Sequence, residues 1–416
     1  MSVIAVDGGH RLCGELVVQS AKNSVLPILA ATILSGDTCV IRRCPRLSDV
    51  ETAIGILCYL GCRVHWETED LVVDSATMDR CDIPEDMMRR MRSSVIFLGA
   101  ILSRCGRAEM SYPGGCELGP RPIDLHVSAL RTLGAEIQEC AGCLNCQGAY
   151  LHGREIVLSI PSVGATENAM LAACGAEGTT TIVNAAREPE ICDLQEFLRK
   201  MGASVHGAGS STITVEGQKN LHGCEHRCIA DRIVAATYLA AAAATGGELC
   251  LRDVDYRHVS TVTTALSQAG CHVHCDENMI CLTSDGTLCG INPVRTAPYP
   301  GFPTDAQAIL MAALLRSRGT TVFVENIFEN RYRHVPELLR MGADIRLEGR
   351  VAVLCGVERL CGTNVRATDL RGGAALVIAG LQGSGTTYIE DIHHIHRGYT
   401  RLVEDLAQLG ANIRYE

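Results

Sequence analysis

The loop around Cys116 holds the most reactive combination of residue types in this chain of 416 residues. It reads Pro-Gly-Gly-Cys-Glu-Leu-Gly-Pro-Arg-Pro over residues 113–122, so the thiol of Cys116 stands near the guanidinium of Arg121. A neighbouring cation favours the thiolate and increases the reactivity of a cysteine. The glycines permit unusual backbone angles, and the prolines restrict them. We therefore predict that this loop presents a reactive thiol or closes over a ligand, rather than holding one more inert cysteine.

Charged and polar residues also recur at the starts of apolar segments that are spread along the chain. They are Lys22-Asn23, Arg92-Ser93, Ser162-Val163-Gly164, Asp231-Arg232, Asp305 and Asp369-Leu370-Arg371. A second recurrent set follows strand-like segments and includes Arg121, Arg187, Arg331 and Arg397. Helix N-termini favour anions, so cations repeated beside them indicate anionic ligands. A single arginine would more simply pair with a carboxylate, but the recurrence favours a shared anion site.

Six copies of one unit position these residues. In each copy a leucine is followed, four residues later, by a glycine and a small residue; the glycines are Gly61, Gly134, Gly202, Gly270, Gly342 and Gly410. Such a glycine is typical of a helix C-cap, and a steady period indicates one supersecondary unit copied several times. Runs rich in Thr, Val and Ile, such as those after Gly178 and Gly319, favour strands. Each unit therefore reads strand, apolar helix, strand, amphipathic helix, strand.

The first helix of each unit is apolar on nearly all sides, which is typical of a buried helix. The second helix, as in residues 192–200, has a clear polar face. The predicted fold class is therefore α/β, with buried helices and outer sheets, the inside-out form of an α/β barrel. Six units suggest two domains of three units each. We place them at residues 21–229, with the Cys116 loop, and at residues 1–20 with 230–416, with the N-terminus pairing with the last units and the active site in the cleft between the domains.

Composition narrows the class of protein further. The formal net charge of −10 argues against a nucleic-acid or anionic-membrane surface, and no segment approaches the roughly 20 apolar residues that span a bilayer. The N-terminus lacks the features of a signal peptide. The 22 cysteines are therefore interpreted as reduced thiols of a cytoplasmic protein. Two groups have metal-like spacing, Cys140/Cys143/Cys146 and His222/Cys224/His226/Cys228, but spacing alone is a weak signal. We expect no metal and no cofactor.

With these residues in view, the chain resembles the UDP-N-acetylglucosamine 1-carboxyvinyltransferase family of enolpyruvyl transferases over its full length. The motifs that carry the resemblance are residues 20–23 (Ser-Ala-Lys-Asn), 113–116, 119–126, 162–166, 184–190, 302–305, 328–331, 367–371 and 396–399. The family fold consists of two domains of three βαβαββ units with buried helices. The family reaction moves the enolpyruvyl group of phosphoenolpyruvate onto the sugar 3′-hydroxyl and releases phosphate, at the start of peptidoglycan precursor synthesis.

The resemblance implies a role for each matched residue. Asp305 would be the base at the hydroxyl, and Cys116 the acid that protonates the methylene carbon, as well as the site of a covalent adduct and of alkylation by the inhibitor fosfomycin. Cations would hold the phosphate (Lys22, Arg121, Arg397) and the carboxylate (Arg331, Arg371). The sugar nucleotide would contact Asn23, Arg92, Arg121, Pro122, Ile123, Asp124, Leu125, Ser162, Val163, Gly164 and Ile327. The expected partners are these two small-molecule substrates, with no nucleic acid and no membrane insertion.

Two positions depart from the family pattern, and two alternatives follow from the fold. Val234 stands where the family often has an acidic residue, and Ile160 where some members have a lysine near the diphosphate. These changes are the support for a non-catalytic, UDP-sugar-binding regulator. The second alternative is the related transferase that acts on a phosphorylated shikimate, which is not expected to carry the Cys116 loop. Retention of Cys116, Asp305 and the arginines favours the UDP-sugar transferase.

Overall fold

The computed structural model describes residues 3–113, 122–140, 142–218 and 220–416. These residues form two compact units, which are described separately. The terminal unit holds the described residues up to Gln19 and from Ala230 to Glu416, and the central unit holds those from Ser20 to Ile229. Cys116 and Arg121 lie outside the described residues. Among the helices that the structure describes, none combines the length and apolar character needed to cross a bilayer.

Three sheets of four strands each form the outer layer of the central unit. Their strand orders are β14-β3-β5-β4, β6-β7-β9-β8 and β10-β11-β13-β12. The strands are β3 Thr38–Arg42, β4 Arg63–Glu67, β5 Asp70–Asp74, β6 Asp82–Ile83, β7 Arg107–Ser111, β8 Glu136–Cys140, β9 Cys143–Gln147, β10 Glu155–Val157, β11 Thr179–Val183, β12 Ser204–His206, β13 Thr212–Glu216 and β14 Glu225–Arg227. In each sheet the first pair is parallel and the other two are antiparallel.

The terminal unit repeats this plan with the N-terminal strands built into it. Its strand orders are β16-β17-β15-β2, β18-β19-β21-β20 and β22-β23-β1-β24. The strands are β1 Ile4–Asp7, β2 Cys13–Val17, β15 Glu248–Arg252, β16 His272–Asp276, β17 Met279–Thr283, β18 Val294–Arg295, β19 Thr320–Val324, β20 Asp344–Glu348, β21 Val351–Cys355, β22 Asn364–Arg366, β23 Thr386–Glu390 and β24 Asn412–Tyr415. Since β1 pairs with β23 and β24, the predicted pairing of the N-terminus with the last units is confirmed.

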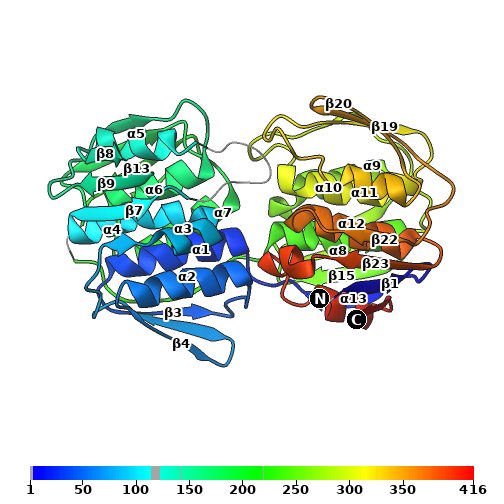
Figure 1. The fold of residues 1–416 in the computed structure, drawn as a ribbon, viewed down its shortest axis with the longest axis horizontal. Coiled ribbons are helices and arrows are strands. Elements are labelled where there is room, and N and C mark those ends of the chain that lie inside the picture. The colour runs from blue at the N-terminus through cyan, green and yellow to red at the C-terminus, as the bar shows by residue number, and fades with distance from the viewer. Residues whose placement is uncertain (1–2, 114–121, 141, 219) are drawn as a thin grey trace. The chain divides into compact units, whose positions relative to one another are not determined.

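Helices alternate with these strands, one buried and one on the outside in each repeat (Figure 1). The helices of the central unit are α1 Lys22–Ala31, α2 Ser48–Tyr59, α3 Glu85–Arg90, α4 Phe97–Cys105, α5 Asp124–Thr132, α6 Val163–Ala173 and α7 Pro189–Lys200. Those of the terminal unit are α8 Arg232–Thr245, α9 Ser260–Gln268, α10 Thr304–Ala313, α11 Val335–Arg340, α12 Leu370–Gln382 and α13 Leu402–Gln408. Short 3₁₀ turns complete some repeats, among them η2 Arg92–Ile96 and η5 Ile392–Arg397.

The first helix of each repeat forms the core, as its composition predicts. In α8 every residue from Ile233 to Ala244 is buried, whereas α9 buries only part of its length. Helices α8, α10 and α12 pack against one another, and their small residues allow this close approach. In the central unit Gly99 of α4 approaches α6 so closely that an added Cβ would lie 2.3 Å from the carbonyl oxygen of Asn168. The predicted fold class, with buried helices and outer sheets, is confirmed; the sheets are six separate four-stranded ones.

The repeated glycines end helices in the predicted way. All six, from Gly61 to Gly410, have φ between 95° and 109°, a left-handed conformation that glycine adopts without strain. Each sheet contains one more strand than the repeat phrases predict, and this additional strand closes an antiparallel pair. The repeat that contains Met78 follows the same plan and supplies the parallel edge strand β6.

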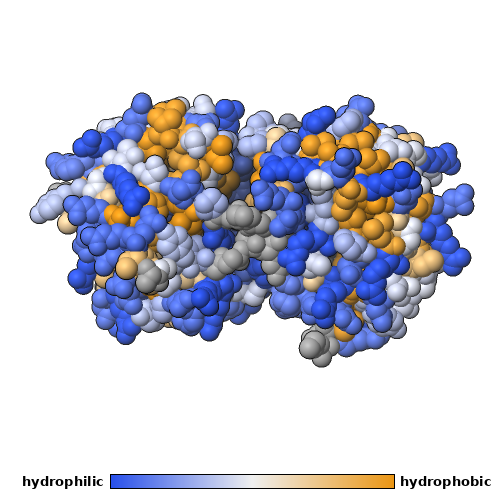
Figure 2. Space-filling model, turned by 45° about the horizontal axis from the view of Figure 1, so that its top comes forward, coloured by the Kyte–Doolittle hydropathy of each residue, from blue (hydrophilic) through white to orange (hydrophobic). Residues whose placement is uncertain are grey.

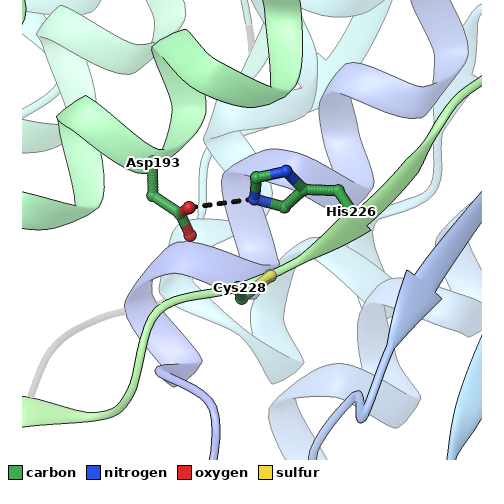
Figure 3. Close-up of side chains that lie close together, drawn as sticks. All are labelled: Asp193, His226 and Cys228. Atoms are coloured by element: carbon green, nitrogen blue, oxygen red, sulfur yellow. Dashed lines mark hydrogen bonds and ion pairs between the residues drawn. The ribbon is translucent and has the colours of Figure 1, made fainter. Parts of the chain in front are cut away.

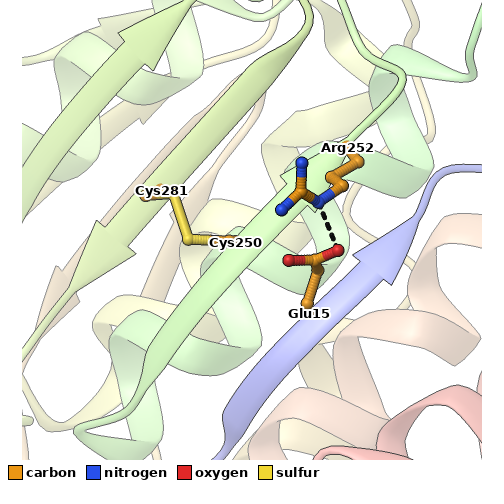
Figure 4. The surroundings of a disulfide bond; sticks show 4 residues. All are labelled: Glu15, Cys250, Arg252 and Cys281. Carbon is orange, nitrogen blue, oxygen red and sulfur yellow. Dashed lines mark hydrogen bonds and ion pairs between the residues drawn. A yellow bond between two sulfur atoms is a disulfide. The ribbon is translucent and has the colours of Figure 1, made fainter.

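One pair of cysteines corrects the interpretation that all thiols are reduced. Cys250 on β15 faces Cys281 on β17, with their Cα atoms 4.1 Å apart, and the two form a disulfide (Figure 4). The physical reason is strand register, since opposed residues of neighbouring antiparallel strands bring their side chains together. Beside the disulfide, Arg252 of β15 pairs with Glu15 of the adjacent strand β2.

Candidate active site

A cluster of charged side chains forms at the start of α10 in the terminal unit. Asp305 lies in the first turn of this helix, and its two carboxylate oxygens are held by different guanidinium groups. Arg331 donates to Oδ1 at 2.8 Å, and Arg371 donates through Nε to Oδ2 at 3.3 Å. Both arginines are almost fully buried, with 2% and 1% of their surface exposed. The predicted base and the two cations predicted to hold a carboxylate therefore meet in one place.

The local sequence fixes each member of this cluster. Arg331 donates two hydrogen bonds at 3.1 Å to the carbonyl oxygen of Thr304, beside Asp305. Asp369 caps α12 by accepting from the backbone N–H groups of Arg371 and Gly372, both at 3.0 Å. An aspartate cap satisfies backbone donors that a helix start leaves open. The same hydrogen bonds fix the backbone of Arg371 and thereby set the direction of its side chain.

Glu325 is a positioning residue that sequence reasoning missed. It follows β19, is buried, and accepts hydrogen bonds from the hydroxyls of Thr296 and Thr304 at 2.9 and 3.0 Å. It also accepts from the backbone N–H of Ile327 at 2.8 Å. Glu325 thus ties the loop that carries Ile327 and Arg331 to the start of α10. A glutamate directly after an apolar strand is the sequence signal that could have found it.

Burial and neighbouring charges shape the electrostatics of the cluster. Burial opposes the charge on Arg371, but Tyr399 and Asp305 outweigh that effect and raise the pKa of its guanidinium. The guanidinium carbon lies 5.5 Å from the ring centre of Tyr399. His334 is fully buried, and this burial lowers the pKa of its imidazole to about 4. The site therefore combines permanent positive charge with a neutral histidine.

Arg397, predicted to bind phosphate, ends η5 two residues before Tyr399. The Tyr399 hydroxyl lies 2.8 Å from that of Thr237 on α8. The loop that carries Arg397 is thereby fixed to the buried helices α8 and α12. The remaining predicted residue of this unit, Ile327, is exposed to 37%.

The central unit holds a cavity of about 600 Å³ where four residues predicted to contact the sugar nucleotide come together. These four are Arg92, Pro122, Ile123 and Asp124, and they share the lining with Tyr112, Arg131 and Glu139 among others. Asp124 begins α5, and the predicted residue Leu125 follows it. The cavity thus runs along one side of α5, from its first residue, Asp124, to its last, Thr132.

Ser162, Val163 and Gly164 form the start of α6, where the Ser162 hydroxyl accepts from the N–H of Ala165 at 3.4 Å. An added Cβ at Gly164 would lie 3.0 Å from the ring of His126 on α5. Burial, with a smaller contribution from Arg92, lowers the pKa of His126 to about 4. Its Nδ1 lies 2.8 Å from the amide nitrogen of Asn168. The segment of 162–164 is therefore packed against the helix that borders the cavity.

Lys22 and Asn23 begin α1, as predicted. The ammonium group of Lys22 lies 3.1 Å from Oδ2 of Asp49 on α2, and both side chains are buried. Lys22, Arg331 and Arg371 thus each face a carboxylate, which is the simpler of the two interpretations offered for cations at these positions. An anionic ligand that displaces the carboxylate of such a buried ion pair would bind the same cation.

The two cysteine-rich segments differ in what they bring together. Cys143 and Cys146 are three residues apart on β9, so their side chains point to opposite faces of the sheet. Among the described residues, a single group with metal-ligand geometry is found; it uses His226 and Cys228 of the second segment together with Asp193 of α7. The sequence pattern did not reveal Asp193.

Comparisons with known proteins agree with this architecture. Residues 6–406 match the family model described as EPSP synthase (3-phosphoshikimate 1-carboxyvinyltransferase). The chain is 49% identical to UDP-N-acetylglucosamine 1-carboxyvinyltransferase 2 of Caldanaerobacter subterraneus subsp. tengcongensis, over 99% of both chains. It is 44% identical to UDP-N-acetylglucosamine 1-carboxyvinyltransferase of Dichelobacter nodosus, also over 99% of both. The crystal structure of the enolpyruvyl transferase NikO from Streptomyces tendae has a TM-score of 0.89 at 26% identity, covering 100% of this chain and 98% of that one.

The chain therefore belongs to the enolpyruvyl transferase family. The family assignment made from its motifs, including the transferase class, is confirmed by relatives that carry the UDP-N-acetylglucosamine name over nearly the full length. EPSP synthase from Acinetobacter baumannii, at 20% identity and a TM-score of 0.76, shares the fold.

The two positions that depart from the family pattern lie in different surroundings. Val234 is fully buried in α8, so its side chain belongs to the core of the terminal unit. Ile160 is 61% exposed, in the segment before α6. Figure 2 shows local apolar patches on a mainly hydrophilic surface. Only Ile160 is exposed enough to contact a ligand directly.

Proposed function

We propose that this chain transfers the enolpyruvyl group of phosphoenolpyruvate to the 3′-hydroxyl of UDP-N-acetylglucosamine and releases phosphate. The observation that carries the proposal is the 44–49% identity, over nearly the full length, to relatives named for this reaction. The Asp305 cluster supplies matching chemistry. The chain would act at the first committed step of peptidoglycan precursor synthesis, in the cytoplasm, and so support wall biogenesis, cell shape and cell division.

In the proposed reaction Asp305 removes the proton of the 3′-hydroxyl while the oxygen attacks the central carbon of phosphoenolpyruvate, and Cys116 protonates the methylene carbon. Loss of a proton from the resulting methyl group then expels phosphate. Such a reaction needs an acid, a base and fixed charges around the leaving group. Because both oxygens of Asp305 face guanidinium groups, the base needs one of them released. The carboxylate of phosphoenolpyruvate, binding Arg331 or Arg371, would release it.

Both units would contribute binding residues. Lys22, Arg121 and Arg397 are proposed for the phosphate, and the cavity bordered by Arg92 and residues 122–124 for part of the sugar nucleotide. Asn23, Leu125, Ile327 and residues 162–164 would complete that contact. Substrate-driven closure of the Cys116 loop would exclude water during the transfer.

The decisive experiment measures phosphate release from phosphoenolpyruvate with UDP-N-acetylglucosamine, with 3-phosphoshikimate, and with neither. We expect release only with the sugar nucleotide. Release with 3-phosphoshikimate would favour the second transferase class, which the description of the matching family model names. Binding of the sugar nucleotide without release would favour the regulator.

A second experiment tests the role of Cys116. Fosfomycin should alkylate the chain at one thiol, and Cys116→Ser should abolish this labelling. Cys39→Ser is the matched control, because hydrogen bonding from Cys224 lowers the pKa of the Cys39 thiol to about 7 while its surface stays fully buried. Unchanged labelling of Cys116→Ser would show that the reactive cysteine is another one.

A further inference from the structure

A group of metal-ligating side chains lies within the central unit, and none of its three members is assigned to the reaction. Asp193 comes from α7, His226 from β14 and Cys228 from the segment that follows β14 (Figure 3). One ligand atom from each lies within 4.8 Å of the other two. The residues are 5%, 4% and 4% exposed, so the group is closed to solvent.

The segment that holds two of these residues explains their shared direction. His226 and Cys228 are two residues apart in extended chain, so their side chains point to the same side. His226 Nε2 lies 2.9 Å from Oδ1 of Asp193. The intervening Arg227 and the preceding Glu225 are exposed. The alternation therefore aims an imidazole and a thiol at α7.

Ser24 links two members of the group, Asp193 and Cys228. Its hydroxyl donates to Oδ2 of Asp193 and also forms a hydrogen bond with the thiol of Cys228. The N–H of Ile229 donates to the same Asp193 oxygen at 3.1 Å. Hydrogen bonds of this kind orient a carboxylate ligand and are a regular feature of metal sites. Ser24 is fully buried, so its oxygen is a fourth polar atom at the same point.

The charges favour a cation at this point. A buried carboxylate needs a cationic partner or a metal. Within the described ranges the partner of Asp193 is His226, whose contact is an ion pair only when the imidazole is protonated. A divalent ion with one carboxylate, one thiolate and one neutral imidazole makes a site without net charge. Oxygen, nitrogen and sulfur are together the ligand set of zinc.

We propose that Asp193, His226 and Cys228 bind a structural zinc-type divalent ion, with the Ser24 oxygen or a water molecule as the fourth ligand. In tetrahedral zinc sites neighbouring ligand atoms lie roughly 3.3–3.8 Å apart, so on binding the 2.9 Å contact between Asp193 and His226 opens slightly and separations near 4.8 Å close by about 1 Å. One proton leaves the Cys228 thiol for each ion bound.

The position of the group gives the ion a clear task. Ser24 stands near the first residue of the central unit and Cys228 near its last, where Ala21 N–H also bonds to the Ile229 carbonyl at 2.8 Å. The ion would therefore link the two chain ends of this unit and stabilise α1, which carries Lys22. The sequence analysis expects no metal, because spacing alone is a weak signal, and the proposal departs from that expectation through Asp193.

The test is the metal content of the full chain, expressed with zinc and purified without chelator, together with its melting temperature. We expect a single zinc ion per chain, loss of that ion in Cys228→Val, and no change in Cys174→Val. Valine fills a buried thiol site without a ligand atom, and Cys174 is a fully buried cysteine of the same unit outside the group. Chelator should lower the melting temperature of the parent chain but leave that of Cys228→Val unchanged.

Cobalt provides a second, spectroscopic readout. Chain produced in cobalt medium should show thiolate-to-metal charge transfer and the visible bands of tetrahedral Co²⁺, and both should be absent in Cys228→Val and in Asp193→Asn. A metal-free parent chain overturns the proposal. So does a metal that persists in Cys228→Val and disappears in Cys224→Ser, since that result assigns the ion to the Cys39 and Cys224 thiols.

Discussion

The two units share one repeat plan but use their loops differently. In the terminal unit three predicted functional side chains are bound to one another, with Asp305 between the buried Arg331 and Arg371. In the central unit several of them line a cavity of about 600 Å³. The same supersecondary unit thus forms a cluster of paired charges in the terminal unit and a cavity in the central unit. We infer that the terminal unit supplies the base and the carboxylate-binding arginines, whereas the cavity of the central unit contributes to recognition of the sugar nucleotide.

The substitution Asp305→Asn tests this difference between the units, and it has the largest expected effect. Loss of a general base lowers turnover by about 10²–10⁴-fold, while binding of UDP-N-acetylglucosamine to the central unit should remain. Turnover and sugar-nucleotide affinity are measured on the same preparation, with Asp344→Asn on the exposed part of β20 as the control. Since the substitution also weakens the hold on two buried arginines, melting curves must show that the variant is folded. A folded variant with parental turnover would remove Asp305 from the role of base.

The units also differ in their cysteines, because the disulfide between Cys250 and Cys281 lies in the terminal unit. Reduction should lower the free energy of unfolding of that unit by about 2–4 kcal/mol. Denaturant unfolding with and without reductant measures the change, and the Cys250→Ser/Cys281→Ser double variant should not respond to reductant. Cys275→Ser, on the neighbouring strand β16, should respond like the parent. Equal unfolding curves for the parent under both conditions would contradict the disulfide.

Local sequence predicted the parts of this structure that depend on local physics. Gly202 and Gly342 end helices because glycine alone adopts positive φ freely, and the apolar run from Ile233 to Ala244 is buried because it has no polar face. Starts of the buried helices were also placed correctly, including Lys22 and Asp369. These features need only neighbouring residues for their explanation.

The rest depends on register and on contacts between distant segments. Asp193 lies 33 residues before His226, and no periodicity connects α7 to β14. The pairing of Cys250 with Cys281 follows from the register of β15 and β17, which the two-residue period of a strand does not fix. Motif resemblance identified Asp305, Arg331 and Arg371, but not that one carboxylate is shared by both arginines. The roles of Cys116 and Arg121 remain predictions, as does the placement of the active site.

Among the described residues, each unit contains one buried histidine whose pKa is lowered, so acid should destabilise both cores. Burial lowers the pKa of both His126 and His334 from 6.5 to about 4. The unfolded chain takes up a proton near pH 6.5, whereas the folded chain does so only near pH 4, so stability falls as the pH drops through this window. Between pH 7 and 5 each histidine should cost about 2 kcal/mol.

Urea unfolding at the two pH values measures this loss. His126→Gln should reduce it for the central unit alone, and His334→Gln for the terminal unit alone. His206→Gln, at an exposed position of the central unit, is the matched control. If the His126 and His334 variants retain the full acid loss, other groups must cause it.

The smallest effect is expected from the cavity itself, and it addresses recognition directly. Arg92→Ala should raise KM for UDP-N-acetylglucosamine about tenfold, equivalent to about 1.4 kcal/mol, and leave kcat close to the parental value. A change confined to KM marks binding that is equal in the ground and transition states. Arg131→Ala is the matched control, because Arg131 lines the same cavity and is not among the residues predicted to contact the sugar nucleotide. A fall in kcat for Arg92→Ala would instead show that this side chain also stabilises the transition state, and its assignment to sugar-nucleotide binding alone would be wrong.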